Sequence, residues 1–326
     1  MRFENSIVRT KNKTMIKYLK HKEIDKKKWD NCIKCSVNGI IYAYSWYLDV
    51  VCPDWEALVE GDYERMFPLT WRRKHKICYL FQPVFSQQLG VFSRSFLSDK
   101  IVDEFLKAIP SKFKFIEINL NTHNKTNNTE FKCFQKVTYE LDLIDSYENI
   151  FKKYSTNTKR NIKKALKSKI TISQNVRPEE IIKIFRKHRG KFINDLQDKD
   201  YQILSRLMYL CLFKSCGYAY GAYTEQNELC AGAFFVQSNK KVIFLFSGVN
   251  KSARESGAMS LLIDSFIKNN SQTALTLDFE GSMDANLARF YKSFGSTKCN
   301  YLHIQKNSLP FLVKLGIKII KTLNFR

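Results

Sequence analysis

The apolar residues in the second half of the chain repeat first with helical spacing and then with strand spacing. Three helical stretches come first, three alternating strands follow, and a helix, an apolar strand, a helix and a last strand close the half. This order predicts an α+β fold with a mixed sheet. The predicted helices lie at 148–168, 178–192, 201–213, 253–268 and 284–294, and the predicted strands at 217–223, 229–237, 241–247, 274–279 and 298–305.

The first half shows the same order less clearly. Because both halves share it, we predict a tandem duplication of domains 1–143 and 144–326, each a mixed central sheet flanked by helices. No Gly-, Pro- or Ser-rich linker separates them, so they should pack tightly. In the first half, helices are predicted at 26–36, 42–52 and 98–109, and strands at 55–60, 66–72, 77–81, 114–120 and 136–143, with a hairpin turn at Gly61 and Asp62.

The chain is strongly basic, with 54 Lys and Arg against 31 Asp and Glu and a formal charge of +23. Such a charge favours partners that carry phosphate, such as nucleic acid, anionic lipid or a phosphorylated cofactor. A compositional bias toward lysine, with the charge simply solvated, is the alternative. Acids are nevertheless scarce, and lysine bias alone does not explain that scarcity.

Cysteine usage and the absence of long apolar runs indicate a cytoplasmic chain. The nine cysteines are an odd number and are scattered. Cys32 and Cys35 form one C-x-x-C without a second pair, and the five histidines are dispersed, so no metal site is predicted. The first residues lack the apolar core of a signal peptide, and no apolar run approaches the ~18 residues of a membrane span.

A predicted strand at 242–246 runs into the stretch SGVNKSARESGAM, within which a helix begins. A strand that feeds a short loop and then a helix leaves backbone N–H groups free at the helix amino end, where the helix dipole favours an anion. Arg254 adds a cationic donor, and Gly257 lets an anion approach the backbone closely. The alternative is that Gly257 only eases helix packing.

The order of elements and this loop resemble the GNAT superfamily of acyltransferases. In that family the loop binds the pyrophosphate of coenzyme A through Arg or Gln, two residues, Gly, one residue, and Gly or Ala. Arg254, Gly257 and Ala258 match this motif in part, although Met259 takes its last small position. The resemblance implies acyl-CoA as co-substrate, and the residues expected to bind it are Ser247, Gly248, Val249, Arg254, Gly257 and Ala258.

The stretch LDFEGSMDANLARFYKSFG resembles the last strand and helix of the same family, in which a Tyr lies four residues before a Gly. Tyr291 and Gly295 have this spacing. The resemblance gives Tyr291 the role of protonating the departing thiolate of coenzyme A. Asp284 stands where the family often has Asn, which is a departure. The alternative for Tyr291 is a half-buried aromatic residue of a helix.

Glu280 follows the predicted strand 274–279, beside the point at which strands splay in this family. Burial there would raise its pKa and suit it to deprotonate an acceptor amine. Strand alternation places Asp278 on the same face, so either carboxylate could be the base, and we favour Glu280. The alternative is a solvated carboxylate or a helix-capping partner.

The stretch YSTNTKRNIKKALKSKITI resembles the segment that opens the second domain of FemABX-type transferases. These are tandem GNAT-like proteins that attach amino acids from aminoacyl-tRNA to peptidoglycan precursors. The matching residues are Ser155, Arg160, Ile162 and Ala165.

The same stretch is a predicted basic helix. Eight basic residues and no acid lie between residues 152 and 169. Without acids to offset their repulsion, the cations favour a bound anion, and a solvated helix face is the alternative. Ile162 and Leu166 are predicted to form its buried stripe. The residues expected to bind substrate phosphate are Lys159, Arg160, Lys163 and Lys164.

Two other segments have open roles. Residues 82–93, QPVFSQQLGVFS, could line an acceptor cleft between the domains or merely cap a strand end. Residues 309–326 form a predicted basic amphipathic helix. It could dock on a domain or lie on an anionic membrane, which would give the chain a peripheral place at the inner membrane surface.

The sequence favours an N-acyltransferase that moves an acyl group from acyl-CoA to an amine of an amino sugar, amino acid or peptide. The second hypothesis is a FemABX-like, aminoacyl-tRNA-dependent transferase acting on a cell-wall precursor. The third is a non-catalytic basic module that binds nucleic acid or membrane. The partial match at Arg254 favours coenzyme A over tRNA as the source of the acyl group.

Overall fold

The computed structural model describes residues 15–190, 196–281 and 283–310. The helices are α1 (Lys26–Cys35), α2 (Ser45–Val51), α3 (Asp99–Lys107), α4 (Tyr147–Lys152), α5 (Thr156–Lys167), α6 (Pro178–His188), α7 (Asp198–Phe213), α8 (Lys251–Ser256), α9 (Ala258–Asn270) and α10 (Ala285–Lys292), with the short 3-10 turns η1 (His21–Glu23) and η2 (Ile41–Ala43). The strands are β1 (Ile16–Leu19), β2 (Glu56–Glu60), β3 (Arg65–Leu69), β4 (Trp71–Lys74), β5 (Ile77–Phe81), β6 (Phe92–Ser93), β7 (Phe113–Asn119), β8 (Lys132–Asp142), β9 (Thr171–Ser173), β10 (Gly217–Tyr223), β11 (Leu229–Ser238), β12 (Lys241–Val249), β13 (Thr276–Asp278) and β14 (Thr297–Asn307).

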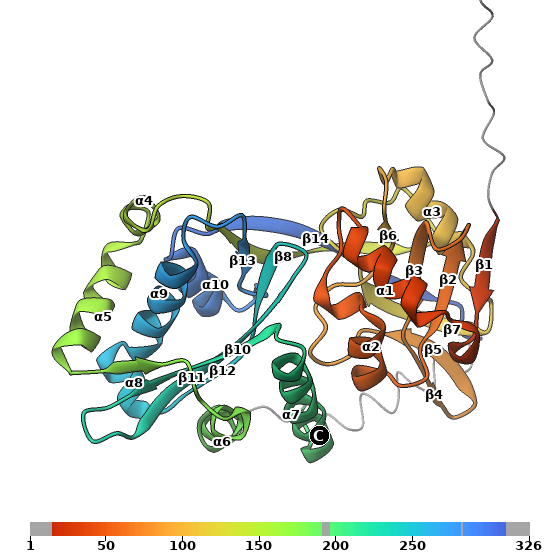
Figure 1. Ribbon diagram of the computed structural model, residues 1–326. Coiled ribbons are helices and arrows are strands. Elements are labelled where there is room, and N and C mark those ends of the chain that lie inside the picture. The colour runs from red at the N-terminus through yellow and green to blue at the C-terminus, as the bar shows by residue number, and fades with distance from the viewer. Residues whose placement is uncertain (1–14, 191–195, 282, 311–326) are drawn as a thin grey trace, which may run out of the picture.

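These elements form a small antiparallel sheet and a large mixed sheet flanked by helices, so the predicted α+β class is confirmed. A small sheet has the order β1-β2-β3-β6, and a large one has the order β4-β5-β7-β14-β8-β13-β12-β11-β10-β9. Within the large sheet β5 pairs with β7, and β12 with β13, in parallel. In Figure 1 the elements of the first half form the right lobe, and α4, α5, α8, α9 and α10 lie in the left lobe.

Strand β14 joins the two lobes. Its residues 303–307 pair with β7 of the first half, and its residues 297–305 pair with β8. Strand β8 in turn pairs with β13 of the second half. The large sheet therefore runs through both lobes without a break, and β8 and β14 cross between them in Figure 1.

Several predicted elements are divided in the structure. The helix predicted at 148–168 becomes α4 and α5, because the Ser155 side chain accepts the N–H of Thr158 and starts a new helix. The helix predicted at 253–268 becomes α8 and α9, since Gly257 adopts a left-handed φ of 81°. The strand predicted at 66–72 ends at Leu69, and β4 then begins in the other sheet.

Buried apolar residues form three clusters. The first joins the lobes, because Trp29 and Tyr47 of α1 and α2 belong to it together with Phe185 of α6 and Leu207 of α7. The second lies between the sheet and helices α5 and α9. The third fills the first lobe and includes Ile304 of β14. No helix in the described part of the chain combines the length and apolar character that a bilayer span requires.

Candidate functional site

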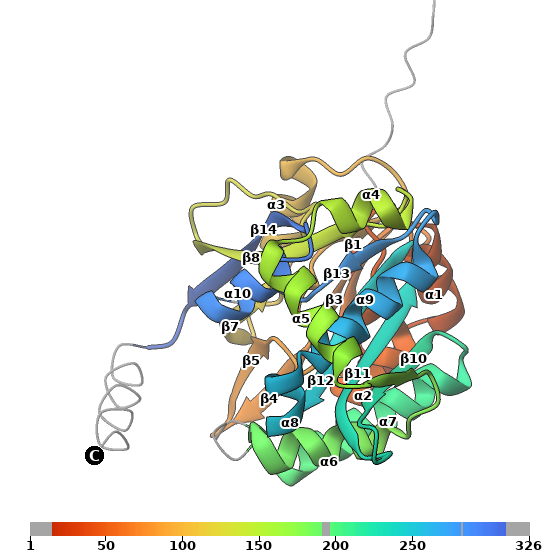
Figure 2. The same ribbon diagram turned by 90° about the vertical axis from the view of Figure 1, so that its left-hand side faces the viewer.

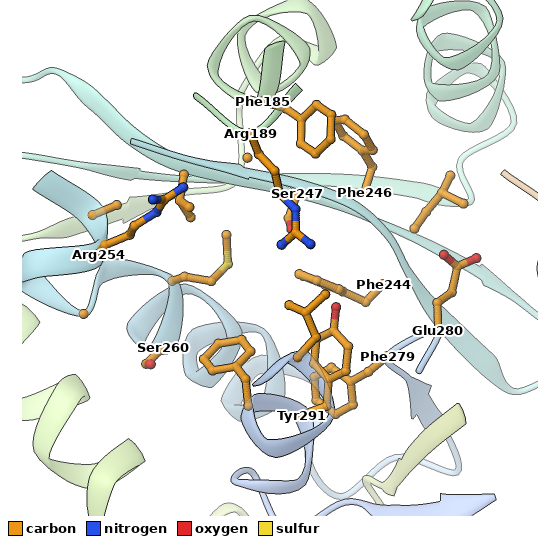
Figure 3. A pocket seen from close by; sticks show the side chains of 18 of the residues that line it. Phe185, Arg189, Phe244, Phe246, Ser247, Arg254, Ser260, Phe279, Glu280 and Tyr291 are labelled. Carbon is orange, nitrogen blue, oxygen red and sulfur yellow. The ribbon is translucent and has the colours of Figure 1, made fainter. Parts of the chain in front are cut away.

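A cavity of about 580 Å³ opens where strands β12 and β13 part. The two strands pair only from Lys241 to Ile243 of β12. Residues 244–249 of β12 continue past β13 and pair only with β11. Side chains from β12, α6, α8, α9 and α10 line the opening (Figure 3). Phe85 from the first lobe also lines it. The wedge between the strands therefore becomes a pocket that both lobes border.

A bulge in β12 shapes the pocket wall. Phe234 of β11 faces Phe246, but the next residue, Phe235, faces Phe244, so that Leu245 is an extra residue in β12. Because of it, Leu245 and Phe246 both belong to the core on the α6 side, while Phe244 belongs to the core on the α9 side. The strand thus presents bulky side chains on two sides of the opening.

Aromatic rings make up much of the cavity wall. The ring of Phe185 lies 4.6 Å from that of Phe246, centroid to centroid, on one side. On the other side Tyr291 stacks on Phe279 at 5.1 Å with an interplanar angle of 19°. These apolar walls exclude water and lower the effective dielectric around the polar groups in the cavity.

One end of the cavity carries the features predicted to bind an anion. Arg254 of α8 and Gly257 line it, and α9 begins immediately after Gly257 without a side-chain cap. The first N–H groups of a helix have no partner four residues back. The Ser260 N–H donates to the Gly257 carbonyl at 3.0 Å, but those of Ala258 and Met259 have no backbone partner among the described residues and are available to a ligand. Helix α5 packs closely against this end of the cavity, because a Cβ on Gly257 would lie only 2.6 Å from the Asn161 carbonyl oxygen.

The six residues expected to bind acyl-CoA do not all lie in the cavity wall. Five of them line it, namely Ser247, Gly248, Val249, Arg254 and Gly257. Ala258, the first residue of α9, has its side chain fully buried in the core. The prediction that Ala258 contacts the ligand therefore applies only to its backbone. In Figure 3, Arg254 lies at the end of the cavity away from Glu280.

Glu280 lies at the other end and has partners from both lobes. Its Oε1 accepts a hydrogen bond from the Tyr42 hydroxyl, its carbonyl oxygen accepts one from Gln87, and its N–H donates to Asp278 at 2.9 Å. Burial raises the pKa of Glu280 to about 8, opposed by the hydrogen bond from Tyr42 and aided by the negative charge of Asp278. A carboxyl with this pKa can exchange a proton near neutral pH.

Asp278 is fully buried and does not line the cavity. Thr138 donates a hydrogen bond to its Oδ1, and the Nζ of Lys241 lies 3.5 Å from its Oδ2. Burial raises the pKa of this carboxyl, against the pull of the Lys241 cation. Asp278 supports the backbone of Glu280, and of the two carboxylates Glu280 is the one that lines the cavity.

Tyr291 of α10 lines the middle of the cavity, with its hydroxyl directed into it (Figure 3). Burial raises the pKa of Tyr291 to about 12, the Glu280 carboxylate adds to the rise, and the Arg189 guanidinium opposes it. The hydroxyl therefore holds its proton at neutral pH and can donate it to a stronger base. Asp284 begins α10 by accepting the N–H groups of Asn286 and Leu287.

The basic helix α5 borders the cavity without pointing its cations into it. Arg160, Lys163 and Lys164 are exposed, and Lys159 is partly buried, with its Nζ donating to the Lys152 carbonyl at 3.0 Å. None of the four takes part in an ion pair within the described residues. The predicted buried stripe is wrong in one position, since Leu166 is 59% exposed.

The buried face of α5 differs from the predicted one by one residue. Ala165 is buried in place of Leu166, together with Ile162 and Thr158. Lys164 lines a separate polar pocket of about 370 Å³ beside Glu255 of α8. The exposed cations of α5 therefore form a surface next to the Arg254 end of the main cavity.

Several cavity residues were not predicted. Arg189 follows α6 and directs its guanidinium toward the cavity (Figure 3), and a basic helix gives no sign of which cation turns inward. The segment 82–93 had two open roles, and the structure places Phe85 in the cavity wall and Gln87 on the Glu280 carbonyl. Within the described residues, no three His, Cys, Asp or Glu side chains gather as metal ligands would.

Comparison with solved structures identifies the fold. FemX matches with a TM-score of 0.61 and 12% identity over 88% of this chain and 96% of its own. L-PGS from Bacillus licheniformis matches with a TM-score of 0.51 and 10% identity over 93% of this chain and 97% of its own. A protein of unknown function from Bacteroides thetaiotaomicron matches with a TM-score of 0.54 and 10% identity over 89% of this chain and 99% of its own. No protein-family model and no curated protein matches the sequence.

The chain therefore shares its fold with FemX and L-PGS, and the predicted resemblance to FemABX-type transferases is confirmed at the level of the fold. The similarity to FemX extends across most of the length of the chain.

Proposed function

We propose that this chain is an N-acyltransferase that moves an acyl group from acyl-CoA to an amine of an amino sugar, amino acid or peptide. One observation carries the proposal. A single cavity brings together an arginine in the last turn of α8, shortly before α9 begins, a tyrosine hydroxyl, and a carboxyl whose pKa of about 8 lies near physiological pH. The FemX-like fold is consistent with transfer of an acyl or aminoacyl group.

In the proposed reaction, Arg254 and the amino end of α9 bind the pyrophosphate of coenzyme A, with Ser247, Gly248 and Val249 beside its pantetheine arm. The acyl thioester then lies between Glu280 and Tyr291. A neutral amine attacks the thioester carbonyl carbon, and the C–N bond forms as Glu280 takes the amine proton. Collapse breaks the C–S bond, and Tyr291 protonates the leaving thiolate.

The cycle closes when a proton passes from the Glu280 carboxyl to the Tyr291 oxygen. Both groups line the same cavity, and the charge of one affects the pKa of the other. No metal is required, because the amine proton and the thiolate are handled by these two side chains.

We further propose that the chain consists of two GNAT-like domains, 1–143 and 144–326, of which the second binds the co-substrate. Each half contributes one parallel strand pair, β5–β7 and β12–β13, to a sheet that is otherwise antiparallel. In this proposal the first domain borders the acceptor side through Phe85, and the chain acts in the cytoplasm. The segment 311–326, with most of the predicted basic helix, lies outside the described residues.

Isothermal titration calorimetry with acetyl-CoA and longer acyl-CoAs tests the co-substrate. We expect binding by the wild type and a loss of about tenfold or more in affinity for Arg254→Ala, because a charge-assisted contact to phosphate is removed. Arg206→Ala is the matched control, since Arg206 is an exposed arginine of α7 away from the cavity. Absence of heat with every acyl-CoA would overturn the proposal.

An aminoacyl-tRNA donor is the second candidate function. The exposed cations of α5, which have no ion-pair partner among the described residues, form a surface beside the Arg254 end of the cavity, where a nucleic acid could run toward the reaction centre. Binding of charged tRNA should then weaken steeply with salt, by about 0.9 in log–log slope for each neutralised duplex phosphate. A slope that stays the same when Lys163 and Lys164 are changed to Gln would exclude this surface as the binding site for tRNA.

A further inference from the structure

We propose that Tyr42 and Gln87 of the first lobe are positioning residues for Glu280, so that the base of the reaction is assembled only where the two lobes meet. The inference rests on the proposed function, because it assigns a role to the residue that acts there as base. Neither residue belongs to a motif of the second half, and both lie about 190 or more residues before Glu280. They contact different atoms of it.

The backbone of Glu280 has a conformation that needs support. Its φ of 53° is left-handed, a conformation that is unfavourable for a residue with a Cβ atom. Hydrogen bonds hold its carbonyl oxygen from Gln87 and its N–H from Asp278. The next residue, Gly281, leaves no room for a Cβ, which would lie 2.2 Å from the Cα of Thr138. Strand β8 and the first lobe thus hold this segment from two sides.

Within the described residues, the side chain of Glu280 has one direct hydrogen-bond donor, the Tyr42 hydroxyl. Tyr42 is 1% exposed and follows Ile41 in η2, packed edge-to-face on Tyr47 at 5.6 Å. A hydroxyl fixed in this way stabilises the carboxylate form of Glu280 and keeps one of its oxygens in a constant place. The other oxygen is left for the incoming amine.

The other groups that act on Glu280 do not replace this contact. The titratable groups around it are Tyr42 on η2, Tyr47 on α2, Asp278 on β13, Tyr291 on α10 and Tyr301 on β14. Asp278 opposes ionisation of Glu280 through its negative charge. Tyr42 is therefore the group in this set that lowers the pKa of Glu280 by direct donation.

The segment that carries Gln87 also shapes the cavity. Phe85 has a left-handed φ of 60°, its carbonyl oxygen accepts the Tyr47 hydroxyl, and its ring lies 6.4 Å from Phe246 across the lobe boundary. A bulky residue in this conformation indicates that the loop is held by its surroundings. The same loop thus supplies one wall of the cavity and one support for the base.

The test uses Tyr42→Phe in the full chain, with Tyr44→Phe as its matched control. The Tyr44 hydroxyl also bonds across the lobes, to Asn239 at 3.0 Å, but it does not touch Glu280. In Tyr42→Phe we expect the acid limb of the kcat/KM profile to move to higher pH by about one unit, because the carboxylate loses its donor. KM for acyl-CoA should stay unchanged, and Tyr44→Phe should leave the limb in place.

A second measurement separates this inference from the proposed reaction. The carboxyl titration of Glu280, followed by NMR of ¹³C-labelled glutamate and assigned with Glu280→Gln, needs no substrate. An upward shift in Tyr42→Phe supports the positioning role even if no acyl-CoA binds. No shift, or an equal shift in Tyr44→Phe, overturns it.

Gln87→Met serves as a second variant if Tyr42→Phe does not fold. It keeps the length of the side chain and removes the donor to the Glu280 carbonyl. We expect kcat to fall with KM for acyl-CoA retained, since the base loses its position while the Arg254 end is untouched. Wild-type kcat in a folded Gln87→Met would count against the inference.

Discussion

The proton on Glu280 is linked to folding, because its carboxyl is poorly solvated in the folded chain. Burial raises its pKa to about 8, so the folded state holds this proton more tightly than the unfolded state does. The stabilising contribution of the proton is complete below the ordinary pKa of glutamate. It is lost as the pH rises toward 8, at up to about 1.4 kcal/mol per pH unit.

Replacing Glu280 by Gln should remove this dependence, because the amide stays neutral while its oxygen still accepts the Tyr42 hydroxyl. Between pH 5 and 8, we expect the Tm of the wild type to fall relative to that of Glu280→Gln. Scanning calorimetry in matched buffers measures the difference. The exposed Glu228→Gln is the control and should keep the wild-type slope; parallel curves for wild type and Glu280→Gln would contradict the raised pKa.

For individual residues, the sequence was enough to predict those site residues that lie in one continuous stretch of the chain. Arg254, Glu280 and Tyr291 were all predicted from local patterns between 247 and 295, and all three line the cavity. Tyr42 and Gln87 were missed because their contacts with Glu280 span about 190 residues or more, and no local spacing records such a contact.

The helices of the second half show why element boundaries were harder to predict than element types. Apolar periodicity continues through Ser155 and through Gly257, so each predicted helix was drawn as one. A cap side chain or a left-handed glycine ends a helix through hydrogen bonds and φ, and these leave little trace in the hydrophobic pattern. The break at Gly257 has a function in the proposed site, because it opens the amino end of α9.

Gly257→Ala should destabilise the chain by about 3 kcal/mol, since it combines a left-handed residue with a backbone clash against Asn161. Gly61→Ala is the matched control. It has a similar φ of 59°, but its Cβ would meet only the flexible side chain of Glu64 at 3.2 Å, so we expect about 1 kcal/mol. Urea unfolding of both variants measures the difference, and equal losses would show that α5 yields to the added methyl group.

For the whole molecule, the order of elements was enough to predict an α+β fold, but the continuity of its sheet was not predictable. Strand β14 was predicted as part of a sheet of the second half, yet it lies between β7 and β8 of the first half. Its alternation of apolar residues fits either position, because only long-range pairing selects the neighbours of a strand. The boundary at 143/144 remains a prediction, and the two halves share one sheet.

A substitution at Ile304 of β14 tests whether the two halves, which share one sheet, unfold together, because Ile304 is fully buried in the core of the first lobe. Ile304→Ala should lower the unfolding free energy by about 2–5 kcal/mol. Tryptophan fluorescence reports on the first half, where all four tryptophans lie, and circular dichroism reports on the whole chain. We expect both to shift together in urea, as one cooperative unit requires.

The exposed Ile144→Ala is the control and should change the free energy by less than about 0.5 kcal/mol. Separate transitions for the two probes in Ile304→Ala would mean that the lobes unfold independently.

The position of β14 also has a consequence for biosynthesis. A ribosome releases β7 and β8 well before β14, so the first lobe emerges with a gap in its sheet that only the last described strand can fill. At 5–20 residues per second, the nascent chain waits roughly ten to thirty seconds in that state. During this interval the edges of β7 and β8 and the apolar site into which Ile304 packs stay exposed to other chains. A chaperone that covers them would raise the yield of native protein.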